Sequence, residues 1–234
     1  MTPRLEIGVV IPVHDEEQRL AACLDAMQDA VAAVHGRVGV VVVVVLDACT
    51  DRSAEIAAGY PFTVVDIDAA TVGVARRAGV ERARAELGVT RPSGLWIAGT
   101  DADSVVPVDW LTFQLDLALS GADVILGSVR PDFVGLSPAH IAHWYETHPA
   151  GVPNGNVHGA NLGIRGSVYD TAGGFDPVAE HEDVRLIERA RAAGASIIAT
   201  AECTVVTSAR LEGRTPGGYA GFLRTLAAEL AGKA

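Results

Sequence analysis

With 234 residues, of which 49% are hydrophobic, the chain can form one large domain around a single core. Its formal charge of −11 argues against a nucleic-acid partner, because phosphate backbones bind basic surfaces and the sequence has no basic stripe. The three cysteines are widely separated and the longest apolar run is about half the length that spans a bilayer, so we expect a soluble, cytoplasmic protein without disulfides or a transmembrane segment.

The first half of the sequence alternates predicted strands and helices. An apolar run at 5–12 precedes a helical pattern at 15–34, and Asp15 and Gln18 have the spacing of a capping box at its start. The further strands are expected at 38–46, 62–67 and 95–99, and the further helices at 50–58 and 71–87. This alternation predicts an α/β fold with a mostly parallel, Rossmann-like sheet flanked by helices, whose ligands bind at the carboxyl ends of the strands.

The second half of the sequence departs from this pattern. After a helix at 107–120 and a strand at 122–129, residues 131–158 are rich in Pro, Gly, His and aromatic residues, which is typical of an active-site insertion. A short helix is expected there at 138–148. The remaining elements are expected to be a strand at 160–165, a turn at 172–177, a helix at 181–193, strands within 195–200 and 203–208, and a helix after Pro216.

Three aspartates fall where predicted strands end: Asp47, Asp101 and Asp103. In an extended loop, residues two apart point the same way, so Asp101 and Asp103 can face one site and hold a divalent cation through carboxylate oxygens. The alternatives are structural. Asp103 can cap the helix that begins near Pro107, and Asp47 can cap the helix at 50–58, where Thr50 or Asp51 would serve equally well.

The ordered motifs resemble the family 2 glycosyltransferases, which have the GT-A fold. The resemblance covers roughly residues 5–210, in the segments IPVHDEEQRL, VVLDACTDRS, VGVARRAGV, TDADS, HGANLGIRGSVYDTAGGFD and EHEDVRL. It implies one GT-A domain over residues 1–234, with a nucleotide-binding half at 1–107 and an acceptor-binding half, including a smaller antiparallel part, at 108–234. It also implies a nucleoside diphosphate sugar as donor.

The resemblance assigns a metal site and a nucleoside pocket. Asp103 and Asp101 would hold Mg²⁺ or Mn²⁺, with Asp101 turned toward the ribose or a water of the metal. Pro12 and Glu16 would line the nucleoside pocket, although acids at a helix start also suit its dipole without any ligand. Asp47 would accept the N3–H of uracil, but the family's Asp-Asp-Gly-Ser is Leu-Asp-Ala-Cys here, which leaves the base open between UDP-linked and GDP-linked donors.

Arginines are the expected partners of the diphosphate. Arg76 and Arg77 lie at a predicted helix start, where a cation is unfavourable to the helix dipole, so an anionic ligand would explain one of them, with Arg76 as the candidate. In relatives a C-terminal loop covers the diphosphate, which implies Arg210 and Arg214. Some relatives place a metal-binding histidine there, but no histidine follows His181 in this sequence, so a third protein ligand is not identified.

The acceptor side contains the candidate catalytic base. The resemblance assigns Asp183 the role of removing the proton of the acceptor hydroxyl in an inverting transfer, with Glu182 beside it. The alternative is an ordinary acidic first turn of a helix. His158, Asn161 and Trp144 are the other candidates for acceptor binding.

The sequence thus predicts a metal-dependent glycosyltransferase that uses a small-molecule or glycolipid-precursor acceptor. A nucleotidyltransferase of similar fold and a non-catalytic nucleotide-binding protein are the alternatives. The former usually carries a phosphate loop with glycine and lysine after the first strand, and IPVHDEEQR has neither. The apolar stripe of the predicted helix at 218–232 either packs on the core or forms a homodimer.

Overall fold

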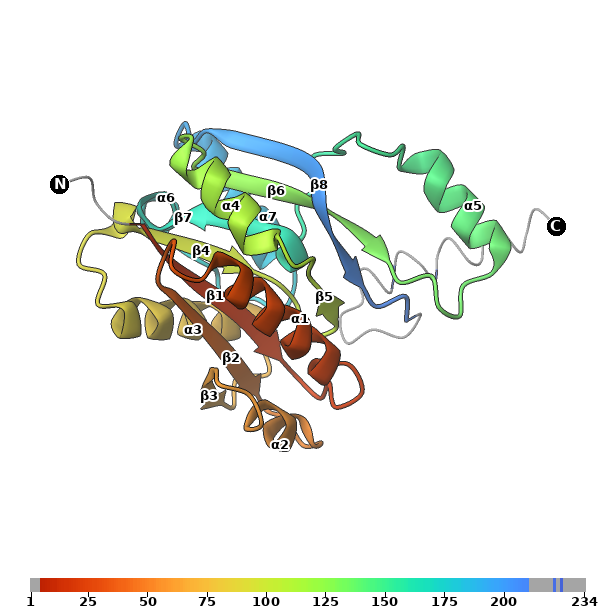
Figure 1. Ribbon diagram of the computed structural model, residues 1–234, viewed down its shortest axis with the longest axis horizontal. Coiled ribbons are helices and arrows are strands. Elements are labelled where there is room, and N and C mark those ends of the chain that lie inside the picture. Colours follow the sequence, from red (N-terminus) through yellow and green to blue (C-terminus); the bar gives the residue numbers. More distant parts are fainter. Residues whose placement is uncertain (1–4, 211–220, 222–223, 225–234) are drawn as a thin grey trace.

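The computed structural model describes residues 5–210, 221 and 224 (Figure 1). In this part of the chain one sheet has the strand order β3-β2-β1-β4-β7-β6-β8-β5. The strands are β1 (Glu6–Val13), β2 (Val40–Asp47), β3 (Thr63–Ile67), β4 (Leu95–Gly99), β5 (Ser104–Val105), β6 (Val124–Pro131), β7 (Leu162–Arg165) and β8 (Ile197–Thr207). The α-helices are α1 (Leu20–Val34), α2 (Ser53–Ala57), α3 (Val72–Leu87), α4 (Trp110–Leu119), α5 (Pro138–Thr147), α6 (Gly166–Thr171) and α7 (Glu182–Ala192).

The first half of the sheet is parallel, as the alternation of elements predicts. β1 pairs with β2 on one side and β4 on the other, and β3 extends the sheet beyond β2. Alternate residues of β2 enter different cores: Val44 packs in the core that contains α1, and Val45 packs in the core that contains α3. Helices therefore cover both faces, which is why β2 is apolar along almost its whole length.

The second half of the sheet is mixed. β7 is antiparallel to both β4 and β6, and β6 and β8 are parallel with a register shift between Gly127 and Val129. The two strands expected at 195–200 and 203–208 are therefore a single strand, β8. Its backbone is irregular at Cys203, where φ is 51°. Such irregularities re-aim side chains without ending the pairing.

Two helix starts differ from the sequence-based prediction. α1 begins at Leu20 and has no side-chain cap, so the predicted capping box is wrong. The carboxylate of Asp15 instead accepts hydrogen bonds from the backbone N–H groups of Thr50 and Asp51, which joins the loops after β1 and β2. Asp51 in turn accepts from the N–H of Ser53 at the start of α2 (2.9 Å).

α5 lies within the insertion that follows β6 and stands away from the sheet (Figure 1). None of its residues is buried, although it forms where the sequence predicts it. The predicted helix at 218–232 lies outside the described residues. Among those described, no helix combines the length and the apolar character that a membrane crossing needs.

Candidate active site

The carboxyl ends of β1, β2 and β4 open into a cavity of about 650 Å³, which α7 and residues 156–160 close on the other side. This is the edge at which a parallel sheet binds its ligands. Ten of the residues expected from the sequence line it: Pro12, Glu16, Asp47, Arg76, Asp101, Asp103, His158, Glu182, Asp183 and Arg210. Asn161 and Trp144 do not line it, and Arg214 lies outside the described residues.

The cavity is strongly acidic. Among the described residues that line it, seven carboxylates face two guanidinium groups, giving a formal charge of −5 with the histidines neutral. The carboxylates are those of Glu16, Asp47, Asp101, Asp103, Glu180, Glu182 and Asp183, and the guanidinium groups are those of Arg76 and Arg210. An anionic ligand would be repelled by this field unless a further cation accompanied it.

Asp101 and Asp103 lie in the loop that follows β4, and both line the cavity. The side chain of Asp101 is 39% exposed and pairs with Arg76, whereas that of Asp103 is 13% exposed and pairs with Arg210 (3.1 Å). Asp103 also accepts hydrogen bonds from Ser104 and Thr207. Burial, and next the charge of Asp101, raises the pKa of Asp103 to about 6.

These two carboxylates fit a hard divalent cation. Mg²⁺ and Mn²⁺ take oxygen ligands, and Mg²⁺ in particular is bound by one or two carboxylates together with water and substrate phosphate oxygens. α4 has no side-chain cap, so Asp103 does not cap the following helix. In the described part of the chain no His, Cys or third acid converges with this pair, since the one such group of three is Asp15, Cys49 and Asp51.

Arg76 joins the two sides of the cavity. It is 2% exposed, its Nε donates to Glu182 Oε1 (2.9 Å), and its Nη2 donates to Asp101. A Cβ atom on Gly159 would lie 2.4 Å from Nη2, so only glycine leaves room for this guanidinium. The sequence predicts an anionic ligand for Arg76, whereas in the structure its guanidinium group pairs with two carboxylates of the chain itself.

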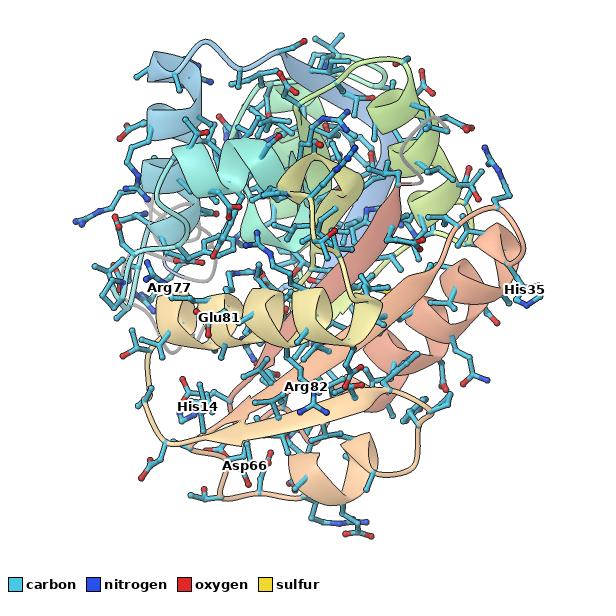
Figure 2. The ribbon with its side chains drawn as sticks, turned by 90° about the vertical axis from the view of Figure 1, so that its left-hand side faces the viewer. His14, His35, Asp66, Arg77, Glu81 and Arg82 are labelled. Carbon is cyan, nitrogen blue, oxygen red and sulfur yellow. The ribbon has the colours of Figure 1, made fainter. Side chains whose placement is uncertain are left out.

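Arg77 is directed away from the cavity. Its Nε donates to the carbonyl oxygen of Phe175 (2.9 Å), on the opposite side of α3 from Arg82 (Figure 2). The side chains of the two adjacent arginines therefore have different surroundings, since Arg76 lines the cavity and Arg77 does not. Arg77 instead joins α3 to the turn at 172–177.

Asp47 lines the cavity but its carboxylate is already engaged. It is 3% exposed and accepts from the backbone N–H groups of Ala69 and Ala70 (both 2.7 Å) and of Thr71 (2.8 Å). It thereby shapes the loop that leads into α3, and the predicted alternative, a cap for the helix at 50–58, is wrong. His14 also lines this end of the cavity, beside the first turn of α3 (Figure 2), and the sequence analysis missed it.

Glu182 and Asp183 are the first two residues of α7. Asp183 accepts from the N–H groups of Gly159 and Val184 (both 2.7 Å), one at each oxygen. Because a carboxylate oxygen has two acceptor positions, each oxygen can still accept a substrate hydroxyl. Burial raises the pKa of Glu182, against the opposing charge of Arg76, and burial lowers the pKa of His158.

Two predicted acceptor residues lie elsewhere. Asn161 is buried: it accepts from Trp110 Nε1 (2.8 Å) and donates to the carbonyl oxygens of Ser128 and Cys203. It therefore fills the irregularity between β6 and β8. Trp144 stacks on His148 with 4.8 Å between ring centroids, and it is His148 that lines the cavity.

Comparison with known proteins identifies the family of this chain. Residues 8–172 match the model of glycosyl transferase family 2, which is more than half of the chain, so the chain belongs to this family. The resemblance of the ordered motifs is thereby confirmed. No curated protein sequence matches the chain.

Solved structures confirm the GT-A fold. Pyrobaculum calidifontis mannosyltransferase PcManGT, in complex with GDP-Man and Mn²⁺, has 21% identity and a TM-score of 0.63 over 91% of this chain and 59% of that one. Staphylococcus aureus TarS 1–349 has 12% identity and a TM-score of 0.60 over 88% of this chain and 61% of that one. Mycobacterium tuberculosis glucosyl-3-phosphoglycerate synthase, with Mg²⁺ and UDP, has 15% identity and a TM-score of 0.57 over 97% of this chain and 78% of that one. The chain thus spans about three fifths of the TarS fragment.

Proposed function

We propose that this chain transfers a sugar from a nucleoside diphosphate sugar, with UDP or GDP as the nucleotide, to a hydroxyl group of an acceptor, and that it depends on Mg²⁺ or Mn²⁺. The observation that carries the metal requirement is the formal charge of −5 on the described cavity lining. A diphosphate adds further negative charge to this field, so it needs a divalent cation as partner. Asp103 and Asp101 are the residues that would hold it.

The cation, when bound, would stabilise the charge of the departing diphosphate. Arg76 keeps Asp101 in place for this purpose, and its second contact, with Glu182, fixes the start of α7. Residues 1–107 would accordingly bind the donor, and residues 108–234 would bind the acceptor. Glu16, Pro12, His14 and Asp47 would border the nucleoside, with Asp47 acting through the loop that it orders rather than as a free acceptor.

Asp183 is the proposed general base. As the acceptor oxygen forms its bond to the anomeric carbon, the hydroxyl proton would pass to Asp183, and the bond between that carbon and the diphosphate oxygen would break with its electron pair on the diphosphate. Attack from the side opposite to the leaving group inverts the configuration. His158, neutral because its burial lowers its pKa, lies beside this carboxylate and can hydrogen-bond a small-molecule or glycolipid-precursor acceptor.

A thermal-shift panel tests the donor part of this proposal. UDP, GDP, CDP, TDP and ADP are each added with and without Mn²⁺ to the wild type and to Asp103→Ala. We expect one nucleotide to raise the Tm of the wild type only with Mn²⁺, and Asp103→Ala to abolish that rise. A response that is independent of both Mn²⁺ and Asp103 would contradict the metal requirement, and no response to any nucleotide would contradict donor binding.

A further inference from the structure

Arg210 lies between two carboxylates at the floor of the cavity. Its Nη1 is 2.8 Å from Glu16 Oε1, and its Nη2 is 3.1 Å from Asp103 Oδ2. Both nitrogens belong to one planar guanidinium group, so the carboxylates of Glu16 and Asp103 face the same cation. One of these carboxylates belongs to the proposed metal site.

The three side chains differ in how firmly they are held. Glu16 is 8% and Asp103 13% exposed, and such poorly hydrated carboxylates need a counter-charge nearby. Asp103 is further held by the hydroxyl groups of Ser104 and Thr207. The side chain of Arg210 is 32% exposed and follows the end of β8, so it is the partner that can leave while the carboxylates stay.

We propose that Arg210 is an internal counter-cation that competes with the divalent cation for Asp103, so that metal binding displaces its guanidinium group from the Glu16–Asp103 pair. The inference rests on the proposed function, since it concerns the same metal site. A guanidinium group and a divalent cation at one carboxylate repel each other at contact distance, so binding of one disfavours the other. The affinity for the metal is then lower than the carboxylates alone would give.

This competition would couple metal binding to donor binding. While Arg210 holds Glu16 and Asp103, its charge offsets part of theirs and orders both carboxylates without a metal. Once displaced, the guanidinium group is available for another anion, and the diphosphate of the donor is the anion that the proposed reaction brings into the cavity. By linkage, a diphosphate that retains Arg210 would strengthen metal binding by the same factor by which the metal strengthens diphosphate binding.

Direct measurement of Mn²⁺ binding, without nucleotide, tests the proposal. Free Mn²⁺ is followed by electron paramagnetic resonance during titration of the wild type, Arg210→Gln, Arg210→Lys and Asp103→Asn. Arg19→Gln is the matched control, since Arg19 is a 38% exposed arginine whose partner Asp132 lies beside the end of β8 but not at Asp103. Tm values measured in chelator confirm that each variant is folded.

We expect Arg210→Gln to lower the Kd for Mn²⁺ roughly tenfold, the scale of one partly screened charge at contact distance. Arg210→Lys should lie between it and the wild type because an ammonium group cannot bridge both carboxylates. Arg19→Gln should match the wild type, and Asp103→Asn should lose binding. An unchanged or higher Kd in Arg210→Gln, with Asp103 still required, would overturn the competition alone. No Asp103-dependent Mn²⁺ binding in any variant without nucleotide would likewise overturn the competition, and its absence also in a repeat titration with UDP or GDP would overturn the metal site of the proposed function.

Discussion

The buried carboxylate of Asp103, the proposed metal ligand, lowers the stability of the folded protein when it is charged. Its pKa of about 6 lies above the ordinary value of 3.8, because burial and the neighbouring Asp101 disfavour the charged form. The folded state therefore binds the proton more tightly than the unfolded state does. As pH rises from about 4 to about 6, stability from this group falls, and the cost is fully present above pH 6.

Asp103→Asn should consequently be more stable than the wild type at pH 8 in metal-free buffer. Because the difference between the folded and unfolded pKa values corresponds to roughly 3 kcal/mol, we expect a gain of about 1 to 3 kcal/mol at pH 8 that falls to about a third of that at pH 4.5. Urea unfolding at the two pH values measures it. A difference that does not change with pH would show that the carboxylate of Asp103 is not held in this unfavourable state.

Gly159 leaves the space that the guanidinium group of Arg76 occupies. A Cβ atom there would lie 2.4 Å from Arg76 Nη2 and 3.0 Å from Cζ. We expect Gly159→Ala to displace the guanidinium group from Asp101 and Glu182, lowering kcat at least tenfold and destabilising the fold by about 1 to 3 kcal/mol. Gly59→Ala, where the nearest atom outside the immediate chain neighbours is the carbonyl oxygen of Ile56 at 3.3 Å, is the control. Equal kinetics for the two variants would refute a positioning function for Arg76.

At the scale of elements, the pairing of β6 with β8 includes the side chain of Asn161, which lies between the two strands in the sequence. Asn161 donates to carbonyl oxygens of both strands where their register shifts, and its own Oδ1 accepts from Trp110. A Cβ atom on Gly127 would lie 2.3 Å from the amide carbon of Asn161, so the Asn161 side chain fills the space beside Gly127. The irregularity is therefore a packed feature of the fold.

Asn161→Ala should lower the free energy of unfolding by about 2 to 4 kcal/mol, because it leaves Trp110 Nε1 and two carbonyl oxygens without partners in the core. At a temperature at which circular dichroism shows the variant to be folded, the KM for the acceptor should remain within about threefold of the wild type. A large increase in KM with unchanged stability would restore the acceptor-binding function that the sequence predicts for Asn161.

Local sequence patterns predicted the elements well and their connections less well. The apolar runs of β1, β2 and β4 and the helical spacing of the apolar residues in α1 are properties of neighbouring residues, so the sequence alone shows them. The partner of Asp15 is a loop about 35 residues away, and the contacts of Arg210 and Glu16 join residues 194 apart. No local pattern carries such information, and for the same reason the sequence could place Trp144 in the insertion but not say that His148 would face the cavity.

For the molecule as a whole, the first and second halves of the chain share one sheet and one ion-pair network. β7 pairs with β4 of the first half and β6 of the second, and Arg76 connects Asp101 to Glu182 across the cavity. We expect a single cooperative unfolding transition, with fluorescence and circular dichroism midpoints that coincide. Two separated transitions would mean that the halves fold independently.

The place of β7 in the sheet also has a consequence for the order of synthesis. β4 and β6 are made before their shared neighbour β7, and β6 is also made before its other neighbour β8, so a nascent chain ending before residue 162 leaves one edge of β4 unpaired and β6 without either partner. The outer edge of β4 therefore stays unpaired on the ribosome until residues 162–165 have emerged from the exit tunnel. Folding of this protein should be late in translation, even though its first four strands and three helices are encoded early.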